Sequence, residues 1–131
     1  MKILVLDRDA TVGRAIERQL RGAGVVHREI NAERAIEWVG AVAGTDARFD
    51  VVLCDDRMPT MTGLRVAEAL SKLVDPPMFV LMTGFRDIGA PDDFVDGLLL
   101  KPFGADGLQT ALAVFVDRGP RRRRSTTLNA A

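Results

Sequence analysis

The chain has 131 residues, a length that fits one compact domain with a real hydrophobic core. Its 18 basic residues balance 18 acidic ones, so the overall charge favours no strongly charged partner. A single cysteine, Cys54, excludes an intrachain disulfide and is typical of a reducing compartment. No apolar run approaches the roughly 20 residues needed to cross a bilayer, and no signal-peptide layout opens the chain. We therefore expect a soluble cytoplasmic protein with no membrane partner.

The first half of the chain has the pattern strand, helix, strand, helix. Residues 3–6 form an unbroken apolar run, which predicts a strand buried on both faces. Apolar residues at helical spacing over 12–20 predict a helix that ends before Gly22. A weaker strand pattern at 25–30 then precedes a second helical pattern at 32–39.

The second half of the chain continues this alternation. Apolar runs at 51–54 and 78–82 predict two more buried strands, with a helical pattern at 66–74 between them. A weaker strand at 98–100 and a last helix over 108–116 complete the series. Alternating strands and helices predict an α/β fold, in which right-handed crossovers place helices on both faces of an open parallel sheet.

Two segments depart from this regular pattern. The interval from 84 to 97 contains glycines and Pro91, so we expect the fourth helix to be shortened. From Arg118 onward the chain is basic and polar, which predicts a disordered tail. The predicted organisation is therefore one domain at 1–117 and a basic C-terminal tail at 118–131.

Polar residues follow four of the five predicted strands. Asp7 follows the first strand, Asp55 the third, Thr83 the fourth and Lys101 the fifth. Sites in open parallel sheets lie at the carboxyl ends of the strands, so these residues should converge. Clustered carboxylates repel unless a cation neutralises them, and Mg²⁺, which prefers oxygen ligands, suits such a site. A lysine and a threonine hydroxyl can hold phosphoryl oxygens.

These motifs resemble those of response-regulator receiver domains. Residues 55–64 (DDRMPTMTGL) are similar to the loop that carries the phosphoacceptor aspartate of that family. Thr83-Gly84 resembles the switch Thr/Ser and the small residue after it, and residues 101–103 resemble its Lys-Pro-Phe motif. The resemblance extends from about residue 2 to residue 116. It implies a flavodoxin-like, doubly wound, five-stranded parallel sheet with strand order 2-1-3-4-5.

The resemblance also implies a role for each matching residue. Asp55 would accept a phosphoryl group from a histidine kinase or phosphotransfer protein in a two-component phosphorelay. Lys101 would hold that group, and Thr83 would move towards it. Asp7, Asp55 and the backbone carbonyl of Arg57 would bind Mg²⁺. Switching through Thr83 would change the face formed by helix 4, strand 5 and helix 5, which would contact an unknown output protein, with a homodimer as a further option.

Two positions differ from the family pattern. Arg8 stands where the family has a second acid that binds the metal directly, and a guanidinium cannot coordinate Mg²⁺. Asp9 is an alternative oxygen donor if the loop bends differently, or Arg8 neutralises Asp55 in place of the metal. Leu98 replaces the usual aromatic switch residue of strand five. Retention of Mg²⁺ binding and of phosphorylation is therefore left open.

Two alternative functions follow from these departures. A pseudo-receiver would keep the fold as a protein-binding module without phosphotransfer. Residues 7–11 (DRDAT) also match the Asp-x-Asp-x-Thr motif of haloacid-dehalogenase-type phosphatases, with Asp7 as nucleophile and Asp9 as acid/base. In those enzymes the acidic pair follows the lysine, whereas residues 55–56 precede Lys101, so we do not expect an enzyme.

The remaining polar and charged candidates are expected to have structural or solvent-facing roles. We interpret Asp56 as a solvated surface acid and Cys54 as a small core side chain. The arginines at 121–124 do not by themselves predict nucleic-acid binding, because no helix-turn-helix pattern has room after Val116.

Overall fold

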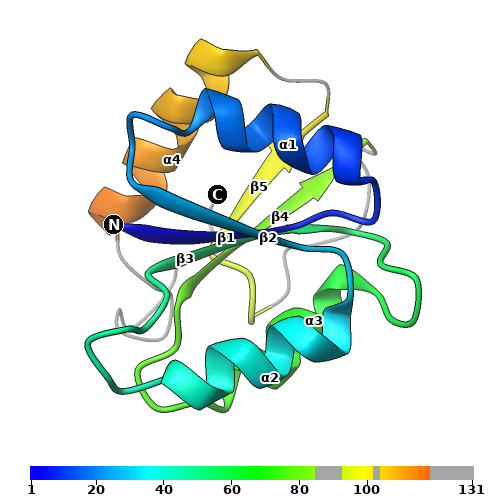
Figure 1. Ribbon diagram of the computed structural model, residues 1–131, viewed down its shortest axis with the longest axis vertical. Helices are drawn as coiled ribbons and strands as arrows, with labels where there is room; N and C mark the ends of the chain where they lie inside the picture. Colours follow the sequence, from blue (N-terminus) through cyan, green and yellow to red (C-terminus); the bar gives the residue numbers. More distant parts are fainter. Residues whose placement is uncertain (85–92, 102–103, 119–131) are drawn as a thin grey trace.

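The computed structural model describes residues 1–84, 93–101 and 104–118. Within them, five parallel strands form one sheet in the order β2-β1-β3-β4-β5, so the predicted strand order is confirmed (Figure 1). The elements along the chain are β1 (Lys2–Leu6), α1 (Ala10–Gln19), β2 (Val25–Glu29), α2 (Ala32–Val42), β3 (Val51–Asp55), α3 (Gly63–Ser71), β4 (Met78–Thr83), β5 (Gly97–Leu100) and α4 (Ala105–Arg118).

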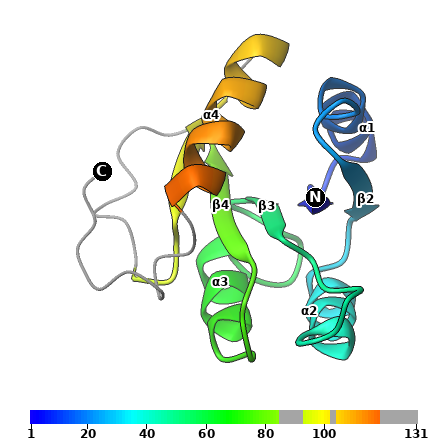
Figure 2. The ribbon, with the colours of Figure 1, turned by 90° about the vertical axis from the view of Figure 1, so that its left-hand side faces the viewer.

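Helices cover both faces of this sheet. Figures 1 and 2 show α1 and α4 on one face and α2 and α3 on the other. The central strands β3 and β4 are buried along their whole length, because each of their faces packs against a helical layer. Strand β2, at the edge, is the most exposed of the strands, which explains its weaker apolar pattern in the sequence.

The alternation of side chains along each strand divides the core into two clusters. Leu4, Val52 and Phe79 belong to the cluster under α2 and α3. Their strand neighbours Ile3 and Val51 belong to the cluster under α1 and α4. Burying a large hydrophobic side chain contributes about 1.5–3 kcal/mol to stability. The two clusters therefore hold the helices against the two faces of the sheet and fix the positions of its strands.

Three helices begin with a capping side chain shortly after a strand or loop at the carboxyl end of the sheet. Asp9 accepts a hydrogen bond from the backbone N–H of Thr11 at 2.9 Å and caps α1. Asn31 caps α2 in the same way, and Thr62 caps α3. Each cap contributes about 0.5–2 kcal/mol and fixes where its helix starts beside the strand ends.

Some sequence predictions fall on residues outside the described ranges. The shortened fourth helix was expected between 84 and 97, and most of that interval is residues 85–92, which are not described. Residues 93–96 form a turn and a bend that lead into β5. Helix α4 is not that fourth helix but the last helix of the series, which the sequence predicts at 108–116, and it continues to Arg118. Residues 119–131 of the predicted tail also lie outside the description. No helix in the described ranges is long and apolar enough to cross a membrane.

Candidate functional site

The predicted site residues meet at the carboxyl edge of the sheet. Asp7 directly follows β1, Asp55 ends β3, Thr83 ends β4 and Lys101 directly follows β5. Among the described residues, the buried polar or charged side chains are those of Asp7, Asp55 and Thr83. Burial of polar groups is unfavourable unless they are paired, so three such groups at one edge indicate a built site.

The parallel register explains why these residues converge. Leu6 pairs with Cys54, so the next residues, Asp7 and Asp55, lie side by side at the strand ends. Asp55 in turn pairs with Met82, the residue before Thr83. The order β1-β3-β4 thus brings together residues that are about 50 and 30 positions apart in the sequence.

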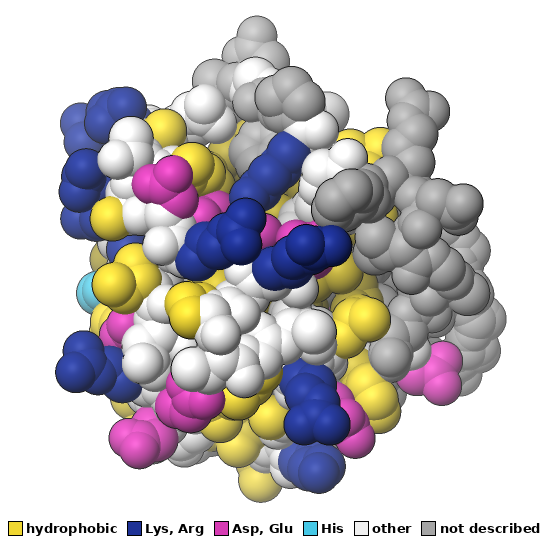
Figure 3. All heavy atoms as spheres, turned by 90° about the vertical axis from the view of Figure 1, so that its right-hand side faces the viewer, with side chains coloured by type: hydrophobic (Ala, Val, Ile, Leu, Met, Phe, Trp, Pro, Cys, Tyr) yellow, Lys and Arg dark blue, Asp and Glu magenta, His cyan; other side chains and the backbone are white. Residues whose placement is uncertain are grey.

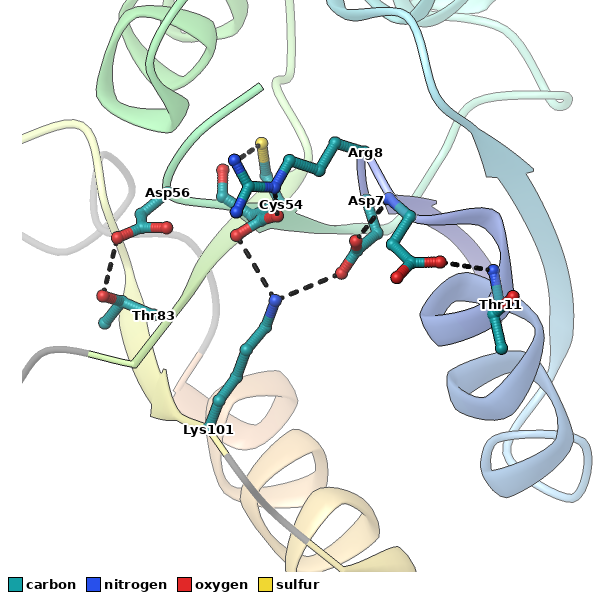
Figure 4. Close-up of polar contacts among 9 residues, drawn as sticks. Asp7, Arg8, Thr11, Cys54, Asp56, Thr83 and Lys101 are labelled. Atoms are coloured by element: carbon teal, nitrogen blue, oxygen red, sulfur yellow. Dashed lines mark hydrogen bonds and ion pairs between the residues drawn. The ribbon is translucent and has the colours of Figure 1, made fainter. Parts of the chain in front are cut away.

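Lys101 joins the two buried carboxylates. Its ammonium nitrogen, Nζ, donates a hydrogen bond to Asp7 Oδ2 and another to Asp55 Oδ1, both at 3.3 Å. Figure 4 shows the side chain of Lys101 reaching towards Asp7, and dashed lines mark the contacts of its ammonium group. The Lys101 side chain is 29% exposed and those of Asp7 and Asp55 are 1% and 6% exposed, so this is a largely buried ion-pair network. Such a network stabilises its acids only while the cation is present.

Arg8 supplies a second positive charge on the solvent side. Its Nε lies 3.8 Å from Asp55 Oδ2, and its side chain is 60% exposed. Figure 3 shows basic side chains lying across acidic ones on this face of the molecule. Because solvent screens an exposed pair, the contact contributes little to stability, yet it places a guanidinium at the mouth of the site.

The loop between β3 and α3 fits tightly against the strand ends. A β-bridge joins Arg57 to Thr62. The next residue, Gly63, packs so closely that a Cβ atom there would lie 2.5 Å from the Asp55 carbonyl oxygen and 2.6 Å from Leu81 Cδ1. Only glycine fits without displacing the backbone that carries Asp55, which gives the Gly-Leu pair of the motif a structural reason.

The sequence model of the response regulator receiver domain matches residues 3–113. The chain belongs to this family. A curated relative, the chemotaxis protein CheY of Pseudomonas aeruginosa, is 32% identical over an alignment of length 127, and the match covers 90% of this chain and 98% of that protein. Receiver domains are signalling modules of two-component systems, so the predicted family and its general function are confirmed.

Solved structures agree with this fold. CheY4 of Vibrio cholerae, a chemotaxis response regulator, aligns with a TM-score of 0.72 and 23% identity over 87% of this chain and 97% of that one. The N-terminal domain of a response regulator/sensory box/GGDEF protein of Carboxydothermus hydrogenoformans aligns with a TM-score of 0.77 and 19% identity over 90% and 95% of the two chains. At these identities the likeness supports the flavodoxin-like fold alone.

Burial changes the acid–base properties of this receiver site. The pKa of Asp55 is raised above its ordinary value, first by burial and then by the charge of Asp7 and the carboxyl group of Asp56, while Lys101 opposes the rise. Burial, followed by the charges of Asp55, Asp7 and Asp56, also raises the pKa of Cys54, so its sulfur stays a thiol at neutral pH. Cys54 is 0% exposed, as expected for a core side chain.

The structure gives Asp9 a different environment from that of Asp55. The Asp9 carboxylate caps α1, and the backbone N–H of Asp9 donates to Asp7 Oδ1 at 2.9 Å.

Within the described ranges, no three His, Cys, Asp or Glu side chains are grouped so that they could hold a metal ion. Residues 102–103 of the Lys-Pro-Phe motif lie outside the described residues.

The expectation for Asp56 is wrong. Its side chain is partly buried, and Asp56 Oδ2 accepts a hydrogen bond from Thr83 Oγ1 at 2.8 Å. A signal was present in the sequence, because two strands that end at Asp55 and Thr83 bring the following residue, Asp56, to the threonine. That signal depends on the exact register of β3 and β4, which apolar runs do not specify to one residue.

Proposed function

We propose that this receiver domain accepts a phosphoryl group on Asp55 in a two-component phosphorelay. The observation that carries the proposal is the buried Asp55 carboxylate, with Lys101 on one oxygen and Arg8 near the other. The donor is a histidine kinase or phosphotransfer protein, and small phosphodonors are expected to substitute for it.

In the proposed reaction, an ionised oxygen of Asp55 attacks the phosphorus of the donor. The new bond is an acyl phosphate P–O bond, and the P–N bond to the donor histidine breaks. The electron pair of that bond remains on the imidazole nitrogen. The transferred phosphoryl group carries delocalised negative charge. Lys101, which is hydrogen-bonded to Asp7 and Asp55, is placed to stabilise that charge during the transfer. Arg8 offers a second cation on the open side.

The acidic pocket of receiver domains typically binds Mg²⁺, and in this chain Asp7, Asp55 and the Arg57 carbonyl stand at the matching positions, with Asp9 as an alternative donor. As arranged, the carboxylate oxygens of Asp7 and Asp55 do not fit a divalent cation. Both oxygens of Asp55 and one of Asp7 face Lys101 or Arg8, and the other Asp7 oxygen accepts the Asp9 N–H. The transfer proposed here therefore uses Arg8 and Lys101 as the neutralising charges.

Phosphorylation would be read out through Thr83. A phosphoryl group adds nearly two negative charges and strong acceptor oxygens, which can draw the threonine hydroxyl towards Asp55. The neighbouring face carries exposed apolar side chains on β5 and α4, where Leu100 is 40% exposed and Val114 is 45% exposed. We propose that an output protein docks on this face when Thr83 changes position.

A pseudo-receiver is the second candidate function. It is favoured by one observation, the ion pair between Arg8 and Asp55, which gives the acceptor a cationic partner from the protein itself. In that case the domain binds its output protein in one state, and Asp55→Asn leaves the binding unchanged.

Intact-mass spectrometry after incubation with phosphoramidate, with and without Mg²⁺, tests the proposal. We expect wild type to gain one phosphoryl group, about 80 Da, and Asp55→Asn to gain none. Asp56→Asn is the matched control, because it removes the adjacent carboxylate and leaves the acceptor in place. Modification of Asp55→Asn, or of no protein under any condition, would contradict the phosphoacceptor function and favour the pseudo-receiver.

A further inference from the structure

A hydrogen bond connects the switch threonine, Thr83, to Asp56, the residue beside the proposed phosphoacceptor. Thr83 is 0% exposed, and its hydroxyl donates to Asp56 Oδ2 at 2.8 Å. In Figure 4, Asp56 and Thr83 lie on the opposite side of Lys101 from Asp7. Thr83 is therefore bound to a carboxylate other than the one that accepts the phosphoryl group.

The backbone on both sides of this contact is fixed. The Asp56 N–H donates to the Met82 carbonyl at 2.8 Å, and the Asp56 carbonyl accepts from the Gly63 N–H at 2.8 Å. On the other strand, the Thr83 carbonyl accepts from the Lys101 N–H at 2.7 Å. Asp56 and Thr83 thus continue the register that pairs Asp55 with Met82, so their meeting follows from the fold.

We propose that Asp56 is a positioning residue that holds Thr83 in the resting state and competes with a phosphoryl group on Asp55 for its hydroxyl. This inference rests on the proposed phosphorylation of Asp55. A threonine hydroxyl has one hydrogen to donate, so it cannot serve both acceptors at once. Movement of Thr83 towards a phosphoryl oxygen therefore requires the bond to Asp56 to break.

The expected strength of this competition follows from the charge of the acceptor. A hydrogen bond to an ionised group shifts an equilibrium by about tenfold or more. The phosphoryl group carries nearly two charges and three acceptor oxygens, so it can still win the hydroxyl. Asp56 is thus expected to delay and weaken the switch without preventing it.

A double-mutant cycle in the unphosphorylated protein tests the contact itself. The four proteins are wild type, Asp56→Ala, Thr83→Val and the double variant, each unfolded in urea. We expect the two substitutions to be coupled by about tenfold in the unfolding equilibrium constant. Coupling below about twofold would overturn the inference, because the hydrogen bond to Asp56 would then not stabilise the resting position of Thr83.

The effect on the switch is measured by the rate at which phosphoramidate modifies Asp55, followed by intact mass. We expect Asp56→Ala to raise the rate about tenfold when Thr83 is present and less than about twofold in the Thr83→Val background. Asp56→Asn keeps an uncharged acceptor oxygen and is expected to fall between wild type and Asp56→Ala. An equal increase in both backgrounds means that Asp56 acts through its charge alone, which overturns the inference.

The two proposals fail in different ways in this experiment. If wild type and all variants gain no phosphoryl group, the phosphoacceptor function fails, and the competing role of Asp56 fails with it. If wild type is modified and the increase does not depend on Thr83, the phosphoacceptor function stands and only the role of Asp56 is lost.

Discussion

The two ends of the parallel sheet handle charge differently. At the amino end, the Lys2 N–H donates to Oδ2 of the exposed Asp50 at 2.8 Å, and the Lys2 ammonium lies 4.3 Å from the centre of the buried Phe49 ring. At the carboxyl end, Asp7 and Asp55 are buried beneath a shared lysine. Buried carboxylates reduce stability unless they are paired, so their presence at one end of the sheet indicates that the functional site lies at that end.

Removing the shared lysine is expected to have the largest effect on stability. Lys101→Met leaves two buried carboxylates without their cation, which should lower the free energy of unfolding by about 2 kcal/mol at pH 7, after allowance for the partial exposure of Lys101. Lys2→Met at the amino end should lower it by less than about 1 kcal/mol. Urea unfolding of both variants measures the difference. Equal losses would show that the two ends do not differ in this respect.

Two glycines extend the comparison to the backbone. Gly63→Ala places a methyl group against the Asp55 carbonyl and Leu81, and overpacking of this kind should cost about 1–3 kcal/mol. Gly40→Ala, inside α2, meets Leu73 Cδ2 at 3.7 Å, an ordinary contact, and should stabilise by about 0.5–1 kcal/mol. In thermal unfolding, the melting temperature should fall for Gly63→Ala and rise for Gly40→Ala. A stable Gly63→Ala would mean that the loop between β3 and α3 can shift.

Strong apolar runs predicted most of the fold from the sequence. The buried runs that became β3 and β4 are apolar throughout, since both of their faces are covered, and this pattern identifies a parallel sheet. The order of the strands came from the family resemblance, because apolar runs do not specify their neighbours. Asp7, Asp55 and Lys101 were predictable since each occurs where a strand ends.

The sequence did not predict the partners of these residues. The position of Asp56 relative to Thr83 depends on a one-residue register, and a strand pattern locates its ends less precisely than that. The role of Asp9 was also ambiguous, because an aspartate after a strand can bind a metal or cap the next helix. Cap geometry in three dimensions places it at the start of α1.

The raised pKa of Asp55 predicts a smaller, pH-dependent effect. A group that binds its proton more tightly in the folded state opposes folding once it ionises, so ionised Asp55 destabilises the protein at neutral pH. Asp55→Asn should therefore raise the free energy of unfolding by on the order of 1 kcal/mol at pH 7. The gain should shrink as the pH falls and disappear below 3.8, the ordinary value for this carboxyl, because the group is then protonated in both the folded and the unfolded state.

The control for this prediction lies at the amino end. Asp46 is exposed, and Asp46→Asn should change the free energy of unfolding by less than about 0.5 kcal/mol across the same pH range. Urea titrations at several pH values compare the two variants. A loss of stability in Asp55→Asn at pH 7 would mean that the ion pair with Lys101 outweighs the burial of the charge.

The smallest expected effect is on metal binding, and it concerns the open side of the site. Arg8 places a positive charge 3.8 Å from Asp55, so we expect Mg²⁺ at 10 mM to raise the melting temperature of wild type by less than about 1 °C. Arg8→Asp replaces that charge with an oxygen donor beside Asp7 and Asp55, and the same Mg²⁺ concentration should raise its melting temperature by about 2–4 °C.

Arg8→Gln separates the two causes of this difference, because it removes the charge without adding a carboxylate. If Arg8→Gln and Arg8→Asp respond equally to Mg²⁺, the guanidinium acts only by repulsion, and the carboxylates of Asp7 and Asp55 are enough to bind the ion. If only Arg8→Asp responds, the wild-type site lacks a ligand. A clear Mg²⁺ response in wild type would show instead that Arg8 swings away from Asp55, as its 60% exposed side chain permits, and that the carboxyl end of the sheet binds metal despite the substitution.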